Sequence, residues 1–188
     1  ISVGYLSIDS IFLPYKPKPF VVLGGSVAYV SLAARRLDSA VSVVSKVGGD
    51  FPDAYMRWLR RGGVDLSGVA KVKGARTTRF ELKYIGDLSN RNLRLKSRAP
   101  PITVEDLPNS LKVRAVHIGP IAGEINYEVV EKLRNYADVL SLDPQGLVRN
   151  FDKEGNITYG AVTDKRLLKI LDIYKSSLDE IKAVTNLS

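Results

Sequence analysis

Residues 24–37, with the sequence GGSVAYVSLAARRL, predict a turn that opens a helix packed on a sheet. Gly24 and Gly25 allow a tight turn, and Ser26 is a suitable N-cap for a helix over about residues 27–37. Alanine and serine recur along this helix, so its backbone can approach a sheet closely. Such a turn also lets backbone N–H groups approach an anion or a polyol, although a turn with no ligand is an equally common use of two glycines.

On both sides of this stretch, strand patterns and helix patterns alternate along the chain. Strands separated by helices of about ten residues favour a parallel sheet with right-handed crossovers, which is the α/β class. The pattern predicts strands at residues 1–8 (ending near Asp9), 41–47, 113–118, 139–142 and 172–175. It predicts helices at residues 52–61, 125–135, 164–171 and 177–185.

The middle of the chain departs from this alternation. Residues 77–85 and 92–96 have the pattern of two strands joined by a turn at 86–90, which is a β-hairpin. The pattern predicts that Phe80, Leu82 and Tyr84 share one face of the first strand. Earlier in the chain, prolines at positions 14, 17 and 19 indicate an extended connection. The hairpin is therefore either an edge addition to the main sheet or a separate lid.

The composition excludes several classes of function. The chain of 188 residues has no cysteine, which excludes disulfides, thiolate catalysis and iron–sulfur clusters. It has no Gly-Lys dipeptide and hence no P-loop, and no GxGxxG follows the first strand. His117 is the sole histidine, and a lone histidine at a strand end is more often a structural hydrogen-bonding group than a ligand or a base.

Lysine and arginine outnumber aspartate and glutamate by 28 to 20, which gives a net charge of +8. The basic residues are scattered, which favours a solvated surface; binding of nucleic acid or another polyanion is the alternative. No apolar run reaches the ~20 residues of a membrane helix, and no secretory signal opens the sequence. We therefore expect a cytoplasmic protein without a membrane partner.

Four separated segments together resemble the ribokinase/PfkB family of carbohydrate and nucleoside kinases. They are residues 24–37; Val3-Gly4 followed by Asp9; residues 47–65, which contain GGDF and GGVD; and residues 170–180, ILDIYKSSLDE. The resemblance implies a ribokinase-like three-layer α/β/α fold with a mostly parallel sheet, as one domain over residues 1–188. Segments at about 11–22 and 77–98 would form a small β lid over the substrate.

Members of this family transfer the γ-phosphoryl group of ATP to a hydroxyl of a sugar, polyol or nucleoside, with Mg²⁺ on the phosphates. The resemblance implies that Asp9 accepts hydrogen bonds from two acceptor hydroxyls, while a closed lid excludes water. It assigns the acceptor site to Asp9, Gly24, Gly25, Tyr29 and Arg79. It assigns Glu180 to Mg²⁺, through water, and Ser177 to the ATP side.

Three departures from the family pattern bear on function. Tyr29 stands where the family has its sugar-binding asparagine, and Ser177 stands where it has the asparagine of its NxxE element. No Gly-x-Gly-Asp element occurs, so the catalytic residue of the family is unassigned here and is expected beyond Ser188. We therefore expect that the chain is incomplete at its C-terminus and that it is inactive alone. For Arg79, a solvated strand face is the alternative.

Two other interpretations stay open: a non-catalytic module that binds a sugar or a protein partner, and a basic α/β protein that binds nucleic acid. Asp143-Pro144-Gln145-Gly146 resembles the corresponding strand end in some sugar and inositol kinases, but the sequence does not name the acceptor. Lid sheets of this family often pair between subunits. We therefore expect a homodimer through residues 77–96.

Overall fold

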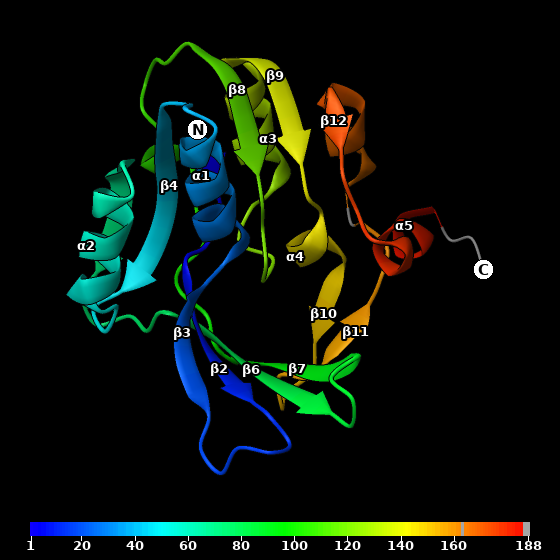
Figure 1. Ribbon diagram of the computed structural model, residues 1–188. Coiled ribbons are helices and arrows are strands. Elements are labelled where there is room, and N and C mark those ends of the chain that lie inside the picture. Colours follow the sequence, from blue (N-terminus) through cyan, green and yellow to red (C-terminus); the bar gives the residue numbers. More distant parts are fainter. Residues whose placement is uncertain (163, 186–188) are drawn as a thin grey trace.

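The computed structural model describes residues 1–162 and 164–185. It has a body built on a parallel sheet, a smaller sheet below it and a short hairpin between the two (Figure 1). The strands of the body are β1 (Ser2–Val3), β4 (Val41–Gly48), β5 (Val64–Val72), β8 (Val113–Ile118), β9 (Ala137–Leu142) and β12 (Ile173–Tyr174). They lie in the order β12-β9-β8-β1-β4-β5, and every neighbouring pair is parallel.

Helices cover both faces of this sheet. The helices α1 (Ser26–Arg36) and α2 (Asp53–Arg61) pack against β4 and β5, whereas α3 (Tyr127–Arg134) packs against β8 and β9. Val43 of β4 belongs to the buried cluster of α1 and α2, and Val44, the next residue, belongs to the cluster of α3. Because successive residues of a strand point to opposite faces, the helices form two outer layers around the sheet. The expected three-layer α/β/α arrangement is confirmed.

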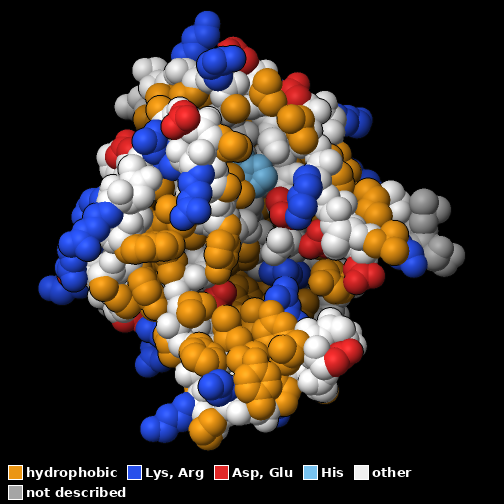
Figure 2. Space-filling view, in the orientation of Figure 1, with side chains coloured by type: hydrophobic (Ala, Val, Ile, Leu, Met, Phe, Trp, Pro, Cys, Tyr) orange, Lys and Arg blue, Asp and Glu red, His pale blue; other side chains and the backbone are white. Residues whose placement is uncertain are grey.

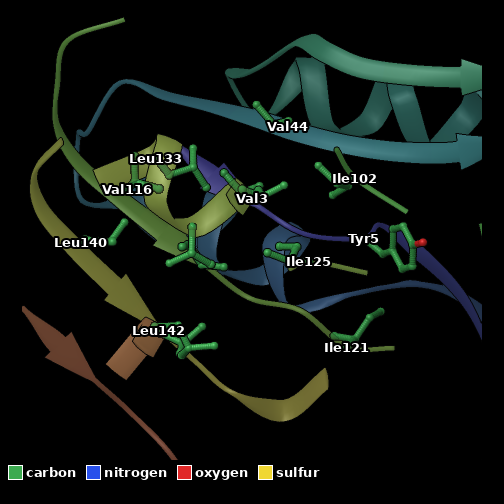
Figure 3. Close-up of a cluster of buried hydrophobic side chains, with 14 of the residues drawn as sticks. Val3, Tyr5, Val44, Ile102, Val116, Ile121, Ile125, Leu133, Leu140 and Leu142 are labelled. Atoms are coloured by element: carbon green, nitrogen blue, oxygen red, sulfur yellow. The ribbon is translucent and has the colours of Figure 1, made fainter. Parts of the chain in front are cut away.

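The larger buried cluster lies between α3 and the middle of the sheet (Figure 3). The strand register places Val3 beside Val44 and Ile118, and Val116 beside Leu140, so these side chains share one face. Full burial of one such side chain contributes about 1.5–3 kcal/mol relative to its exposed state. This core fixes the positions of the strand ends from which the candidate site is built.

The smaller sheet is the lid, which we define as β2 (Ser7–Phe12), β3 (Phe20–Gly24), β6 (Thr78–Ile85) and β7 (Asn90–Ser97). Its strand order is β3-β2-β6-β7; β2 pairs with β6 in parallel, and the other two pairs are antiparallel. The central hairpin is thus part of a separate sheet and not an edge addition to the main one.

The prediction of one strand over residues 1–8 is wrong, because the chain leaves the main sheet after Val3. At Gly4 an ideal Cβ would lie 2.4 Å from the carbonyl oxygen of Gly119, so only glycine fits at this close approach. The chain then turns away and enters β2. Asp9 therefore lies within a lid strand and not at the end of a strand of the main sheet.

A second hairpin, β10 (Arg149–Phe151) and β11 (Ile157–Tyr159), links the body to the lid. The N–H of Leu95 in β7 donates to the carbonyl oxygen of Gly155 at the hairpin tip (2.8 Å). Gly155 has φ +85°, and an ideal Cβ there would lie 2.0 Å from the carbonyl oxygen of Leu95, so the contact requires glycine. The hairpin thus joins one edge of the lid to the body.

Three local predictions also differ from the structure. The N-cap of α1 is Gly25, and Ser26 is the first helical residue. The helix predicted at 164–171 is a 3₁₀ helix, η2 (Lys165–Ile170); the short helix α4 (Gln145–Val148) and the 3₁₀ turn η1 (Val104–Asp106) were not predicted. The last helix, α5 (Leu178–Thr185), follows β12 as expected.

Over residues 1–162 and 164–185, no helix has the length and apolar character needed to cross a membrane.

Candidate functional site

A cavity of about 440 Å³ lies between the lid and the strand ends of the body. This volume falls within the range of about 300–1,000 Å³ that is typical of small-molecule sites. In Figure 2, charged side chains gather in the hollow between the body above and the largely apolar lid surface below. The lining residues come from the lid, α1 and the segments after β8 and β9: Ser7, Asp9, Gly25, Ser26, Tyr29, Val30, Phe80, Leu82, Arg91, Leu93, Ile121, Asp143, Gln145 and Arg149.

Asp9 lines the cavity from β2. Its Oδ1 accepts a hydrogen bond from the hydroxyl of Ser7 at 2.8 Å. Burial raises the pKa of Asp9, while the Ser7 hydroxyl and the charges of Arg91 and Arg149 act in the opposite direction. An ionised carboxylate offers about four lone-pair sites, so Asp9 can accept further hydrogen bonds from hydroxyls in the cavity.

Gly24 and Gly25 shape the wall next to this carboxylate. At Gly24 an ideal Cβ would lie 2.1 Å from Asp9 Oδ2, so the carboxylate occupies the space that a side chain would fill. Gly25 lines the cavity with φ +95°, and an ideal Cβ there would lie 2.2 Å from the carbonyl oxygen of Tyr5. Gly25 therefore requires glycine, whereas a side chain at position 24 would displace the Asp9 carboxylate. Gly25 lines the cavity itself, and Gly24 makes room for Asp9.

Tyr29 lines the cavity from α1, and 61% of it is exposed. Its hydroxyl donates to the carbonyl oxygen of Leu23 at 3.2 Å. From the lid, Arg91 of β7 lines the same cavity; its Nη1 donates to Tyr84 Oη at 3.0 Å, and its guanidinium lies 5.8 Å from the centre of that ring. The sequence analysis did not single out Arg91.

The lid also supplies an apolar wall, formed by Phe80, Leu82 and Leu93. Leu82 of β6 and Leu93 of β7 are direct partners in the strand register, so their side chains lie side by side on the same face. The alternation of Phe80, Leu82 and Tyr84 predicted this face of the hairpin. An apolar wall next to carboxylates suits a ligand with hydroxyls at its edge and C–H groups on its face.

The body supplies the remaining polar groups. Asp143 follows β9, and its Oδ2 pairs with Lys175 Nζ at 3.0 Å. Arg149 at the start of β10 donates to Gln145 Oε1 (2.9 Å) and to the carbonyl oxygen of Ile121 (3.2 Å). Burial lowers the pKa of Arg149, but a guanidinium is not deprotonated in proteins, so the side chain stays a cation. Two carboxylates and two guanidiniums therefore share the cavity, which favours a ligand with no large net charge.

Comparison with known proteins shows what the chain is related to, although no protein-family model matches it. The inositol 3-kinase of Oryza sativa subsp. japonica is 30% identical over 173 residues, which cover 84% of this chain and 42% of that protein. A pyrophosphate-dependent kinase in the ribokinase family, solved with a pyrophosphate analog and myo-inositol, has a TM-score of 0.83 at 29% identity and covers 99% of this chain and 64% of the solved one. The chain belongs to the ribokinase/PfkB family.

This ribokinase-family chain has other relatives with different acceptors. The cytidine kinase of Thermococcus kodakarensis is 26% identical over 149 residues, which cover 77% of this chain and 51% of that protein. A second solved structure has a TM-score of 0.83 at 29% identity and covers 99% of this chain and 62% of the solved one. It is a pyrophosphate-dependent myo-inositol-1 kinase that was converted into a myo-inositol-3 kinase. The conversion replaced an asparagine and a serine, eleven positions apart, with leucine. The chain thus spans about half the length of the two curated relatives and less than two thirds of the two solved chains.

Arg79 is not among the residues that line the cavity of the ribokinase-family chain. It is adjacent to Phe80 in β6 and therefore points to the other face of the lid. There its Nη2 donates to Asp50 Oδ2 at 2.8 Å, and Asp50 Oδ1 accepts from the N–H and the hydroxyl of Thr77, both at 2.7 Å. The structure places Arg79 in a contact that ties the start of β6 to the turn after β4.

This contact makes a prediction about stability and pH. Burial acts to raise the pKa of Asp50, but the bonds from Arg79 and Thr77 outweigh it and lower the pKa to about 2. Because the folded pKa is depressed, the stabilisation is present above the unfolded pKa of about 3.9 and is lost as the pH falls toward the folded one. We expect Asp50→Asn to lower the free energy of unfolding by about 1 kcal/mol at pH 7, a figure discounted for the partial exposure of the pair.

Urea unfolding of both proteins between about pH 7 and pH 3 checks this prediction. The difference between parent and variant is expected to shrink as the solution is acidified. Asp65→Asn is a matched control, because the Asp65 side chain is exposed at the start of β5 and accepts local bonds from Ser67, two residues later. A difference that stays constant down to low pH would show that the ionised carboxylate is not the source of the stability.

Glu180 and Ser177 form the N-terminus of α5 and do not line the cavity. The N–H of Ser177 donates to Glu180 Oε2 (2.7 Å), and the N–H of Glu180 donates to Ser177 Oγ (3.3 Å), which is a capping box. In the part of the chain that the structure describes, no three His, Cys, Asp or Glu side chains come together as a metal site. The Glu180 carboxylate is thus bonded within the cap, and the roles of Glu180 toward Mg²⁺ and of Ser177 toward ATP stay predictions. The Gly-x-Gly-Asp element expected beyond Ser188 lies outside the described residues.

Glu124 is a residue of the site region that sequence reasoning missed. It is 1% exposed, and its carboxylate accepts from the backbone N–H groups of Tyr5 (2.9 Å), Ile121 (3.0 Å) and Ala122 (2.8 Å). Burial raises the pKa of Glu124, and the N–H bonds act in the opposite direction. The residue fixes the loop that brings Ile121 into the cavity wall. A single glutamate within a predicted loop gave no pattern that could have found it.

Proposed function

We propose that this chain forms the acceptor-binding part of a kinase that transfers a phosphoryl group to a hydroxyl of a small cyclic polyol. The observation that carries the proposal is the cavity between lid and body, in which carboxylates and an apolar wall face the same space. Asp9 and Asp143 are hydrogen-bond acceptors for hydroxyls, and bonds to ionised groups are stronger than neutral ones. Leu82 and Leu93 offer the C–H face of a ring a surface away from water.

The leucine pair supports an inositol as the acceptor. In the solved relative, two leucines eleven positions apart accompany the change from a myo-inositol-1 kinase to a myo-inositol-3 kinase. Leu82 and Leu93 are also eleven positions apart, pair directly across β6 and β7, and line the cavity. The rice relative is an inositol 3-kinase. The proposed reaction is therefore phosphorylation of the 3-hydroxyl of myo-inositol.

The proposed phosphoryl donor is ATP or pyrophosphate. The sequence resemblance implies ATP, whereas the solved inositol kinases named above are pyrophosphate-dependent. Mg²⁺ would arrive with the donor phosphates, as it commonly does where a protein supplies few ligands of its own. The chain's own part is to hold the acceptor against Asp9 and the apolar wall of the lid and to exclude water. We also propose that the protein is located in the cytoplasm.

An activity screen of the complete protein that contains residues 1–188 tests this function. ATP and pyrophosphate are each offered with myo-inositol, ribose, fructose and cytidine, and the phosphorylated product is quantified. We expect the highest kcat/KM with myo-inositol. A preference for cytidine would replace the polyol with a nucleoside, the acceptor of the Thermococcus relative. Saturable binding without transfer from either donor would favour a non-catalytic module, and salt-dependent DNA binding alone would favour the nucleic-acid alternative.

We also propose a homodimer through the lid, at its β3 edge and not through residues 77–96 as the sequence led us to expect, because the other edge strand, β7, contacts the hairpin of β10 and β11. Phe20 and Val21 of the edge strand β3 are 48% and 57% exposed, and an edge strand with apolar side chains is a surface for pairing. We expect the double substitution Phe20→Asp and Val21→Lys to convert a dimer into a monomer, as measured by light scattering. The control is Leu37→Asp, at a body residue that is 79% exposed. A monomeric parent, or a lid variant that stays dimeric, would contradict the proposal.

A further inference from the structure

The carboxylate of Asp143 is buried and only half satisfied. Its side chain is 9% exposed, and the residue lines the cavity. Oδ2 accepts from Lys175 Nζ at 3.0 Å and from Gln145 Nε2 at 3.3 Å. Oδ1 is buried and has no hydrogen-bond partner within residues 1–162 and 164–185. A buried polar atom without a partner is rare and costly in a folded protein, so this oxygen calls for an explanation.

The local fold does not need this side chain. The N-cap of α4 is Pro144, and no side chain caps that helix. The turn is closed by backbone bonds alone, from the N–H of Gly146 to the carbonyl oxygen of Pro120 (2.8 Å) and from the N–H of Leu147 to that of Pro144 (2.7 Å). An aspartate before proline that only caps a turn would use its carboxylate in such bonds. The Asp143 carboxylate instead bonds two side chains and keeps one buried oxygen without a partner, in a residue that lines the cavity.

We propose that Asp143 is a second acceptor-binding residue, which takes one hydroxyl of the polyol from the body while Asp9 binds from the lid. This inference rests on the proposed function. Oδ1 of an ionised carboxylate can only accept, so its partner must be a donor such as a hydroxyl. Lys175 already balances the charge of Asp143, so the partner need not be a cation. The site thus takes a neutral ring with hydroxyls on two edges.

This assignment predicts which ligands the site rejects. An acceptor that lacks the hydroxyl at Asp143 leaves a buried oxygen unpaired, and sites built around a hydroxyl discriminate strongly against analogues without it. Asp143→Asn has a related effect. Lys175 and Gln145 both donate, so the amide oxygen stays with them and the amide NH₂ group turns toward the cavity. A donor then faces the ligand hydroxyl in place of an acceptor.

The test measures equilibrium binding of myo-inositol and of each monodeoxy-inositol to the complete protein by calorimetry. For Asp143→Asn we expect the dissociation constant of myo-inositol to rise about ten- to hundredfold. In the parent, we expect one monodeoxy-inositol to bind more weakly than myo-inositol by a similar factor. In Asp143→Asn, we expect that analogue and myo-inositol to bind with the same affinity. Asp138→Asn is the matched control, because it makes the same chemical change at an exposed residue of β9 that does not line the cavity; we expect its affinity to stay within about threefold of the parent.

Each outcome decides between the proposals. If Asp143→Asn binds myo-inositol as the parent does, Asp143 is not a ligand and the inference is overturned. An equal loss in Asp138→Asn and Asp143→Asn also overturns it, because a general disturbance of the body would then explain the effect. If the parent binds no polyol, the proposed function fails and this inference fails with it. The deoxy series guards against misfolding, since a misfolded variant would lose every ligand rather than become insensitive to one hydroxyl.

Discussion

The double substitution Leu82→Asn and Leu93→Ser is expected to move the new phosphate from the 3-hydroxyl to the 1-hydroxyl of myo-inositol. The two leucines form an apolar wall of the cavity, and polar side chains there would hydrogen-bond ring hydroxyls that leucine cannot. A change of two contacts, each worth about tenfold in discrimination, gives a shift of about a hundredfold in the product ratio. The two products are mirror images, so chromatography on a chiral column measures the ratio.

A matched control separates this effect from a general disturbance of the lid. Ile85→Asn with Leu88→Ser makes the same chemical changes in the same hairpin, at residues that are 49% and 37% exposed and do not line the cavity. We expect this control to keep the product ratio of the parent. If both double variants alter the ratio equally, or neither does, the leucine pair does not set the position of phosphorylation.

Asp9→Asn is expected to weaken myo-inositol binding about a hundredfold while the donor KM stays unchanged. The carboxylate lies in the cavity wall and accepts a hydrogen bond from Ser7 at Oδ1, so its remaining lone pairs can bond ligand hydroxyls. Loss of the charge weakens two such bonds, and bonds to charged groups contribute about 1.5–3 kcal/mol each. Steady-state kinetics of the complete protein, with acceptor and donor varied in turn, measures the two constants separately.

Asp87→Asn is the control for this substitution. Asp87 lies in the lid turn, where its carboxylate accepts from the N–H and the hydroxyl of Ser89 and does not reach the cavity. It therefore makes the same chemical change in the same sheet without touching the site. An acceptor KM that rises equally in both variants would mean that Asp9 acts through the lid's stability and not through a bond to the acceptor.

The fold class and the glycine turn could be predicted because both depend on local patterns. The alternation of β-branched strands with helices indicated a parallel sheet, and the structure confirms it. The first strand could not be divided correctly, because the division depends on Gly119, a residue far along the chain that approaches Gly4. An apolar run of eight residues has the same pattern whether it forms one strand or two strands in different sheets.

The lid shows a different limit of sequence reasoning. The hairpin was found from its alternating pattern, but the arginine was chosen on the wrong face: Arg79 neighbours Phe80 and points away, whereas Arg91 pairs with Tyr84 and lines the cavity. The side-chain period of a strand is two, so the predicted apolar face of Phe80 and Leu82 already indicated that Arg79 lies on the other side. The sequence therefore already indicated the orientation of Arg79. Arg91 lies on the cavity face because it pairs with Tyr84 in the strand register.

Other parts of the site depend on contacts that no local pattern carries. Glu124 is recognised only when the N–H groups of Tyr5 and Ile121 are seen to converge on it. Asp143 gave only a weak signal, as a strand-end aspartate before proline. Its free oxygen becomes visible only once Lys175, 32 residues later, is seen to occupy the other oxygen. Long-range contacts of this kind decide which of many polar residues belong to the site.

Hydrogen exchange of the complete protein, with and without saturating myo-inositol, tests whether the acceptor enters between lid and body. The account predicts slower exchange in β2, in β6 and β7, and in the segment from Asp143 to Arg149, because these elements line the cavity. It predicts little change in α2, which supplies no lining residue. Unchanged exchange in the lid strands at saturating myo-inositol, or protection confined to surfaces outside the cavity, would contradict the account.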